Sequence, residues 1–148
     1  MSEPRHSDAR VARVVAFFEE LTPADLPRLG EIYSDAARFK DPFNEVEGVA
    51  AITAVFEHMY RALHEPRFVV RAVVADGDQC FLTWDFLVRF PRFAPERTQT
   101  VRGASQLLFA ADGRIALHRD YWDAAEELYE KLPAVGALMR WLKRRAGA

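Results

Sequence analysis

The first half of the chain repeats its apolar residues with the period of an α-helix. In three stretches they recur three or four positions apart, which predicts three helices with one buried face each. Ser7–Asp8 and Thr22–Pro23 are typical helix starts, and Pro66 marks the end of the third helix. The predicted buried faces are Val11, Val14, Val15 and Phe18, then Leu26, Leu29 and Tyr33, then Val49, Ile52, Phe56, Met59 and Leu63.

A short extended piece, Ala37 to Asp41, separates the second predicted helix from the third. It stops at Pro42, because proline disfavours the helical backbone for the residue before it. Asp41 therefore stands at the end of a strand, where its carboxyl group can be aimed into a cavity. The alternative is that Asp41 serves only as a turn residue or a cap, as aspartate before proline commonly does.

The second half of the chain changes to a period of two. This alternation predicts four strands, because successive side chains of a strand point to opposite faces of the sheet. Asp76–Gly77–Asp78 and Asp112–Gly113 are turn sequences that predict antiparallel hairpins. The predicted strands are Arg67–Ala75, Gln79–Phe90, Thr98–Phe109 and Arg114–Trp122.

The helical period returns after Asp123, which is well placed to cap the new helix. Pro133 is expected to split this C-terminal helical segment, residues 124–145, into two short helices. Helices segregated on one side of an antiparallel sheet define an α+β fold. We therefore predict a single domain over residues 1–148, with residues 1–8 disordered. Its expected shape is a cone-shaped α+β barrel, in which a curved antiparallel sheet wraps around helices and encloses a pocket.

The composition narrows the class of partner. Half of the 148 residues are hydrophobic, and 11 Phe, 4 Tyr and 3 Trp are enough to line a cavity as well as fill a core. The net charge of -2 gives no overall basic field, so no nucleic acid is expected as a partner. No apolar run approaches the roughly 20 residues that cross a bilayer, so no membrane contact is expected either. Cys80 is the single cysteine, which fits a reducing compartment and predicts a cytoplasmic protein.

Alternation along the last strand leaves one question open. The two strands before it have a clearly apolar face, formed by Leu82, Trp84, Phe86 and Val88 and by Val101, Gly103, Ser105, Leu107 and Phe109. The last strand has no such clear choice. If its His118 face also points inward, His118 and Asp120 enter an otherwise apolar space. A carboxylate in such a space is a candidate general base or acid.

Two local strings resemble the nuclear transport factor 2-like superfamily. Phe39–Lys40–Asp41–Pro42, followed by Gly48 and the Ala50–Ala51–Ile52 helix start, is similar to its ketosteroid isomerase and SnoaL-like polyketide cyclase branches. Asp112–Gly113–Arg114–Ile115, followed by Arg119 to Asp123, is similar to the end of limonene epoxide hydrolases. The resemblance spans nearly the whole chain and implies the cone-shaped fold.

The resemblance also assigns roles to single residues. Asp41 matches the proton-shuttling aspartate of ketosteroid isomerases, whose oxyanion donors correspond here to Phe17 and Ser105. Asp120 matches one member of the Asp-Arg-Asp triad of limonene epoxide hydrolases, and the other two positions hold Trp84 and Phe86. These missing partners argue against both activities. An Asp and His pair for acid–base chemistry, as in SnoaL-like cyclases and related dehydratases, is what remains.

We therefore expect Asp41, His118 and Asp120 to be catalytic. No metal or other cofactor is indicated, since His58 and His64 lie six positions apart and off one helix face, and no Cys/His cluster or glycine-rich phosphate loop is present. The expected substrate-binding residues are Phe17, Phe56, Tyr60, Trp84, Phe86, Gly103, Ser105 and Trp122.

Two classes of function fit this pattern. The first is a cofactor-free isomerase, dehydratase or cyclase acting on a small, apolar, oxygenated molecule, because a purely apolar binder gains nothing from buried carboxylates. The second is a module without catalysis that binds a hydrophobic ligand or a protein partner, which the missing oxyanion donors favour. A homodimer through the outer face of the sheet is expected, since Phe81, Leu87, Leu108 and Tyr121 lie there among polar residues.

Overall fold

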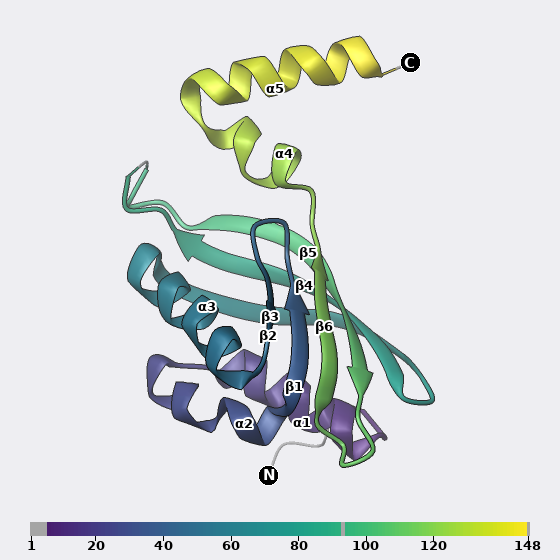
Figure 1. Cartoon of the computed structure of the whole chain (residues 1–148). Coiled ribbons are helices and arrows are strands. Elements are labelled where there is room, and N and C mark those ends of the chain that lie inside the picture. Colours follow the sequence, from purple (N-terminus) through teal and green to yellow (C-terminus); the bar gives the residue numbers. More distant parts are fainter. Residues whose placement is uncertain (1–5, 93, 148) are drawn as a thin grey trace.

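Six strands form one curved sheet in the order β2-β1-β6-β5-β4-β3 (Figure 1). The structure, a computed structural model, describes residues 6–92 and 94–147. Residues 1–5 of the stretch predicted to be disordered lie outside the described residues. The strands are β1 (Tyr33–Lys40), β2 (Glu45–Glu47), β3 (His64–Asp76), β4 (Gln79–Arg89), β5 (Gln99–Phe109) and β6 (Ile115–Tyr121).

The helices lie on one face of the sheet and beyond one of its ends (Figure 1). The α+β prediction and the cone-like arrangement are confirmed. Asp8 caps the first helix, and its carboxylate accepts a hydrogen bond from the backbone N–H of Arg10. The helical elements are α1 (Ala9–Glu20), the 3₁₀ helix η1 (Pro23–Arg28), α2 (Leu29–Ile32), α3 (Val49–Ala62), α4 (Ala124–Glu127), the 3₁₀ helix η2 (Tyr129–Lys131) and α5 (Pro133–Ala146).

Strands β3 to β6 pair as consecutive antiparallel neighbours, as the turn sequences predicted. The predicted inward residues of β4 and β5 do face the core, since Leu82, Val88 and Leu107 are buried. The core also takes the predicted α1 stripe, because Val11 and Val15 are almost fully buried. Helices α1 and α3 pack against β3, and α3 also reaches β1. These contacts place the concave side of the sheet opposite the two helices.

Strand β1 differs from the prediction. Tyr33 was expected on the buried side of a helix, but it is the first residue of β1. The helical region before it is short because Pro27 lacks the N–H that an α-helix would use, so a 3₁₀ helix and a single α-helical turn replace one longer helix. Strand β1 also runs parallel to β6, whereas an antiparallel sheet was expected. The short strand β2, which was not predicted, covers the other edge of β1.

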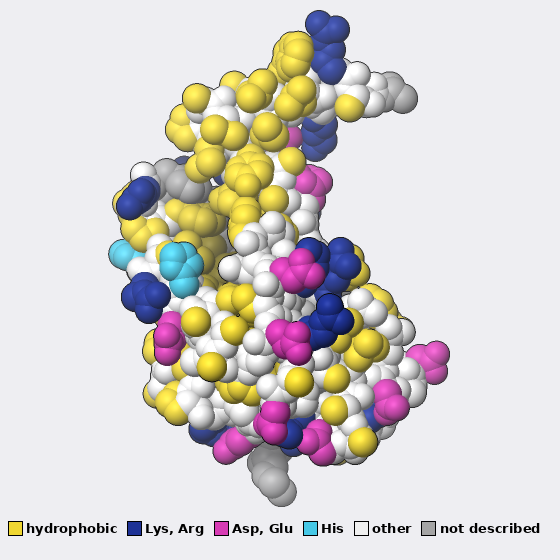
Figure 2. All heavy atoms as spheres, viewed as in Figure 1, with side chains coloured by type: hydrophobic (Ala, Val, Ile, Leu, Met, Phe, Trp, Pro, Cys, Tyr) yellow, Lys and Arg dark blue, Asp and Glu magenta, His cyan; other side chains and the backbone are white. Residues whose placement is uncertain are grey.

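The C-terminal segment leaves the body of the protein after β6. Asp123 caps α4 by accepting from the N–H of Glu126, as predicted. Pro133 does divide the segment, but it opens a 14-residue α5 after α4 and η2, so the segment is not two short helices. Helix α5 packs against η2, where Arg140 donates to the carbonyl oxygen of Glu130, and projects away from the sheet (Figure 1). Hydrophobic side chains are exposed along it (Figure 2). No helix in the described ranges is both long and apolar enough to cross a bilayer.

Candidate functional site

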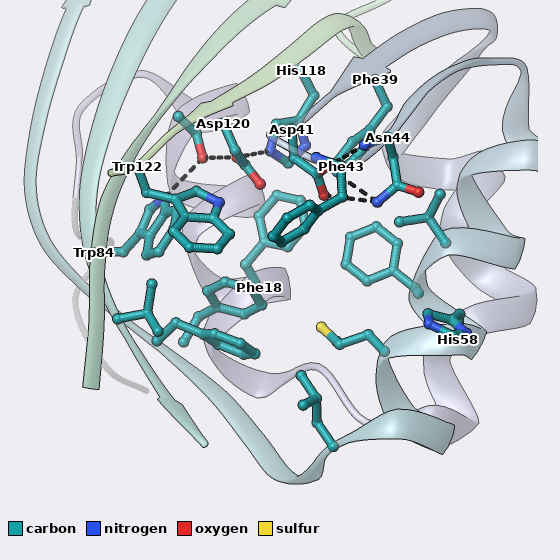
Figure 3. A pocket seen from close by; sticks show the side chains of 18 of the residues that line it. Phe18, Phe39, Asp41, Phe43, Asn44, His58, Trp84, His118, Asp120 and Trp122 are labelled. Carbon is teal, nitrogen blue, oxygen red and sulfur yellow. Dashed lines mark hydrogen bonds and ion pairs between the residues drawn. The ribbon is translucent and has the colours of Figure 1, made fainter. Parts of the chain in front are cut away.

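A cavity of about 310 Å³ opens between the concave side of the sheet and helices α1 and α3 (Figure 3). This volume is typical of small-molecule pockets, which measure about 300–1,000 Å³. Aromatic rings form most of its wall, and a few polar side chains join them. The aromatic lining residues are Phe18, Phe39, Phe43, Phe56, Phe68, Trp84, Phe86, Phe90 and Trp122, and the polar ones are Asp41, Asn44, His58, Ser105, His118 and Asp120.

The pairing of β1 with β6 brings the three predicted catalytic residues to one wall. In this parallel pair Phe39 lies opposite His118, and Lys40 lies opposite Arg119. Asp41 and Asp120 are each one residue beyond that last pair, so the two carboxyl groups belong to neighbouring chain segments. Both line the cavity together with His118 (Figure 3). The open question about β6 is thereby answered, because its His118 face points inward.

Asp120 is held by two hydrogen bonds to one of its oxygens. The Oδ1 atom lies 2.6 Å from Nε2 of His118 and accepts from the Ser105 hydroxyl, also at 2.6 Å. Figure 3 shows the other carboxylate oxygen of Asp120 pointing into the cavity. In the described residues 6–92 and 94–147, Asp120 pairs with His118, and the Asp120 side chain is 16% exposed. It is therefore an acid group in a mostly apolar chamber that, among the described residues, forms no ion pair with a Lys or Arg.

The hydrogen bonds continue on both sides of Asp120. On one side Nδ1 of His118 lies 2.6 Å from the Tyr33 hydroxyl, which no solvent reaches. On the other side the indole N–H of Trp84 donates to Ser105 Oγ at 2.9 Å. Burial, and secondly the nearby charge of Asp120, raise the pKa of Tyr33 well above its ordinary value of 10.0. The Tyr33 hydroxyl therefore keeps its proton at neutral pH.

Rings of three aromatic residues enclose the His118 imidazole. Phe39 and Phe18 meet it edge-on, with centroids 4.8 and 5.6 Å away, and Tyr33 stacks at 5.9 Å. Such packing fixes the orientation of the imidazole plane, so its two nitrogens stay aligned with Tyr33 and Asp120. The ring is well placed to orient Asp120.

Asp41 is both a cavity residue and a turn residue. Its Oδ1 accepts from the backbone N–H groups of Phe43 at 2.8 Å and Asn44 at 2.6 Å, and the Asn44 amide donates to both of its oxygens at 3.1 Å. This is an Asx turn that folds the chain between β1 and β2. The turn interpretation therefore describes the local contacts of Asp41, and its oxygens have fewer open positions for a ligand than those of Asp120.

The structure divides the eight predicted substrate-binding residues into two groups. Phe56, Trp84, Phe86, Ser105 and Trp122 line the cavity. The other three, Phe17, Tyr60 and Gly103, do not line it.

Each of these three residues is kept out of the lining by a local cause. Phe17 is rotated about 100° around α1 from Phe18, and Phe18 is the one that continues the buried stripe into the cavity. The Tyr60 hydroxyl donates to the carbonyl oxygen of Leu21, which turns that ring away, and Met59 lines the cavity instead. Gly103 offers no side chain, and the Trp84 indole covers it.

Several site residues were not predicted. Tyr33 was assigned to a helix, so its contact with His118 was not visible. Asn44 follows Asp41 at a spacing that favours an Asx turn, which is a signal that the sequence does carry. His58 was considered only as a metal ligand, although it lies three residues after Val55 on α3 and both residues line the cavity. In the part of the chain that the structure describes, no three His, Cys, Asp or Glu residues are arranged to hold a metal ion.

Comparison with known proteins assigns the chain to a family. The profile of the SnoaL-like domain matches residues 14–118, well over half of the chain. The chain belongs to the SnoaL-like domain family. A search of curated protein sequences finds no match.

Solved structures similar to this SnoaL-like domain share its fold at low sequence identity. A protein from Jannaschia sp. CCS1, provisionally assigned as a SnoaL-like polyketide cyclase, is 18% identical with a TM-score of 0.69, over 85% of this chain and 93% of that one. An epoxide hydrolase from M. tuberculosis that resembles limonene epoxide hydrolase is 16% identical with a TM-score of 0.66, over 94% and 96%. TerC, crystallised with polyporic acid, is 17% identical with a TM-score of 0.66, over 79% and 91%.

Proposed function

We propose that this SnoaL-like domain is a cofactor-free acid–base enzyme that moves a proton on a flat, apolar, oxygenated molecule. Asp120 is the base in this proposal, His118 and Ser105 orient it, and Asp41 is a second carboxylate at the same wall. Isomerisation, dehydration and ring closure next to a carbonyl group can each begin with removal of an acidic C–H proton, so one positioned base serves any of the three.

One observation carries the proposal. Asp120 presents an oxygen to an apolar cavity and has its other oxygen fixed by two donors. Placing a carboxylate in such surroundings is costly, and a module that only binds apolar molecules gains nothing from it. A base held at a fixed angle in a water-poor chamber gains both orientation and reactivity.

The lining supports the class of substrate. Aromatic rings surround the cavity on most sides, including the stacked pair Phe68 and Phe86 with centroids 4.7 Å apart. Flat rings offer most contact to a flat ligand, so a planar cyclic or polycyclic molecule is favoured. The structural similarity to TerC, which was crystallised with polyporic acid, and to a protein provisionally assigned as a polyketide cyclase is in keeping with this class.

A proton-exchange experiment tests the proposal without knowledge of the natural substrate. The probe is 2-tetralone in D₂O, because its α C–H is acidic and its fused rings suit an aromatic cavity. In the proposed step the Asp120 carboxylate takes the α proton and the enolate forms. The carboxylic acid then exchanges its proton for a deuteron with the D₂O solvent and returns that deuteron to the same carbon. NMR follows the loss of the α-proton signal.

The wild type should exchange the α protons faster than buffer does. Asp120→Asn should lower that rate about 100-fold or more, since positioned general bases contribute about 10²–10⁴-fold. Asp41→Asn is the matched variant, because asparagine keeps an Asx turn. It should keep the fold and lose less of the exchange than Asp120→Asn does, because Asp120 is the proposed base. Equal exchange by the wild type and Asp120→Asn would overturn the proposal. Binding of the probe without exchange in the wild type would favour a ligand-binding module.

A further inference from the structure

The hydrogen bonds around Asp120 form one continuous chain with a direction. It runs from the Tyr33 hydroxyl through His118 to Asp120, and from the Trp84 indole through Ser105 to the same oxygen. The participating side chains come from four adjacent strands, β1, β6, β5 and β4. The direction of each hydrogen bond depends on which groups carry the hydrogens. The Trp84 indole can only donate, whereas the Tyr33 hydroxyl can donate or accept.

The Trp84 end is fixed by the chemistry of indole. The indole N–H is a donor and has no acceptor, so Ser105 Oγ must accept at 2.9 Å. The Ser105 hydrogen is then free for the 2.6 Å contact with Asp120, which is a short hydrogen bond of the charge-assisted kind. Trp84 thereby determines which way the Ser105 hydroxyl points.

The Tyr33 end is fixed by burial. Tyr33 has no solvent contact, and burial raises the pKa of its hydroxyl well above 10.0, so it remains a hydroxyl. Its hydrogen has the His118 Nδ1 atom 2.6 Å away as an acceptor. If Nδ1 accepts, Nε2 carries the imidazole hydrogen and donates it to Asp120 at 2.6 Å.

We infer that Tyr33 and Trp84 are positioning residues that act from opposite ends of this chain. Together they direct every hydrogen toward Asp120 Oδ1, hold His118 as the neutral tautomer with its hydrogen on Nε2, and leave Oδ2 to face the ligand. The hydrogen-bond directions and the His118 tautomer are inferred from the contacts alone. Their consequence for proton removal at Oδ2 rests on the function proposed above. In this arrangement His118 orients the base, whereas Asp120 takes the proton.

The tautomer of His118 is the direct test, and it needs no substrate. Long-range ¹H–¹⁵N correlation spectra of ¹⁵N-histidine protein distinguish a protonated Nε2 from a protonated Nδ1, and a His118→Gln spectrum assigns the signals. The wild type near pH 7 should show His118 with hydrogen on Nε2 alone. A His118 that carries hydrogen on Nδ1, or on both nitrogens, would overturn the inference before any positioning residue is replaced.

Variants of Tyr33 and Trp84, at the two ends of the hydrogen-bond chain, then test whether each residue orients its neighbour or only packs against it. Tyr33→Phe removes the donor to Nδ1 and keeps the ring, so the His118 signals should shift toward a mixture of tautomers. Tyr60→Phe is the matched control, because the Tyr60 hydroxyl bonds to Leu21 outside the cavity, and it should leave them unchanged. Unchanged His118 signals in Tyr33→Phe would refute the role of Tyr33.

Trp84→Phe tests the other end through the rate of α-proton exchange. It should slow the exchange at saturating probe roughly 3- to 10-fold, which corresponds to the loss of one hydrogen bond, whatever the altered cavity wall does to the half-saturating concentration. Trp141→Phe on the exposed α5 is the control, and it should have no effect. An unchanged rate in Trp84→Phe would refute the role of Trp84. If the wild type shows the expected tautomer but no exchange, the proposed function fails and the positioning role of Tyr33 stands.

Discussion

Gly103 and Trp84 lie opposite each other on β5 and β4, and the indole ring of Trp84 occupies the space that a side chain at 103 would need. A Cβ atom on residue 103 would lie 2.7 Å from Cζ2 of the indole and 2.9 Å from Cζ3. Such contacts are far inside van der Waals distance, and the ring is rigid. Glycine at this position therefore lets the indole lie flat on the strand with its N–H directed at Ser105.

Gly103→Ala should displace the Trp84 ring. Adding a methyl group to a packed site typically costs about 1–3 kcal/mol, and here the hydrogen bond to Ser105 is lost as well. Urea unfolding should show the loss, and the change in tryptophan fluorescence should report the altered indole. Gly30→Ala is the control, because its Cβ would meet only a side-chain carbon of Val49 at 3.9 Å. Equal stability of Gly103→Ala and wild type would contradict the steric argument.

The free cysteine should make stability depend on pH in the alkaline range. Burial, followed by the charge of Asp8, raises the pKa of Cys80 from 9.0 to about 11. The folded state thus holds the thiol proton more tightly than the unfolded chain does. The protonated thiol therefore makes its full contribution to the free energy of unfolding below about pH 9, and this contribution is lost as the pH rises through about 11. Urea unfolding across this range should show a steeper fall for the wild type than for Cys80→Ala. Parallel pH profiles of the two proteins would contradict the prediction.

Much of the fold was predictable because its signals are local. The period changes from helical to alternating between Leu63 and Arg67, and the Asp–Gly turns set the hairpins, so four of the six strands follow from short stretches of sequence. The α1 stripe was likewise readable from spacing. Its limit appears at Phe17 and Phe18, where one residue of offset rotates a side chain by about 100° and exchanges a cavity residue for its neighbour.

The polar part of the site depends on contacts that spacing cannot show. Tyr33 and His118 are 85 residues apart, and they meet only because β1 pairs in parallel with β6. The sequence also left open which face of β6 points inward, because one face carries the apolar Leu117 and the other carries the polar His118. Their neighbours decide the outcome, because Asp120 and His118 find partners inside the cavity that satisfy them.

A homodimer through the outer face of the sheet remains our expectation. Phe81 and Tyr121 are 40% and 45% exposed on that face, and Val74, the partner of Phe81 on β3, is 68% exposed. Light scattering at micromolar concentration should give twice the chain mass of 16.9 kDa. Phe81→Glu should shift the protein toward monomer, because it places a charge in an apolar contact. Leu138→Ser on α5 is the control, and a dimer lost in that variant instead would assign the interface to α5.

The last helix should be dispensable for folding. Helix α5 packs against η2 and has no extensive contact with the sheet, whereas Leu128 before it lines the cavity and Glu127 pairs with Arg102 at 2.8 Å. A chain that ends at Leu132 should keep the β-sheet signal in its far-UV circular dichroism spectrum. Its melting temperature should lie within about 5 °C of that of the full chain. A chain that ends at Asp123 should melt at a lower temperature. Equal losses in both would show that α5 contributes contacts to the body.

Replacements of Asp120 should separate stability from activity. Asparagine keeps an oxygen that accepts from Ser105 and His118 and removes the charge from the apolar cavity, so the free energy of unfolding of Asp120→Asn should equal or exceed that of the wild type. Alanine leaves both donors without an acceptor and should cost about 1–3 kcal/mol. Urea unfolding of the three proteins, with α-proton exchange measured on each, checks the pair of outcomes. A structural carboxylate would instead make the wild type the most stable of the three, with both variants less stable in proportion to the contacts removed. A base retained for chemistry gives an Asn variant that is stable and inactive.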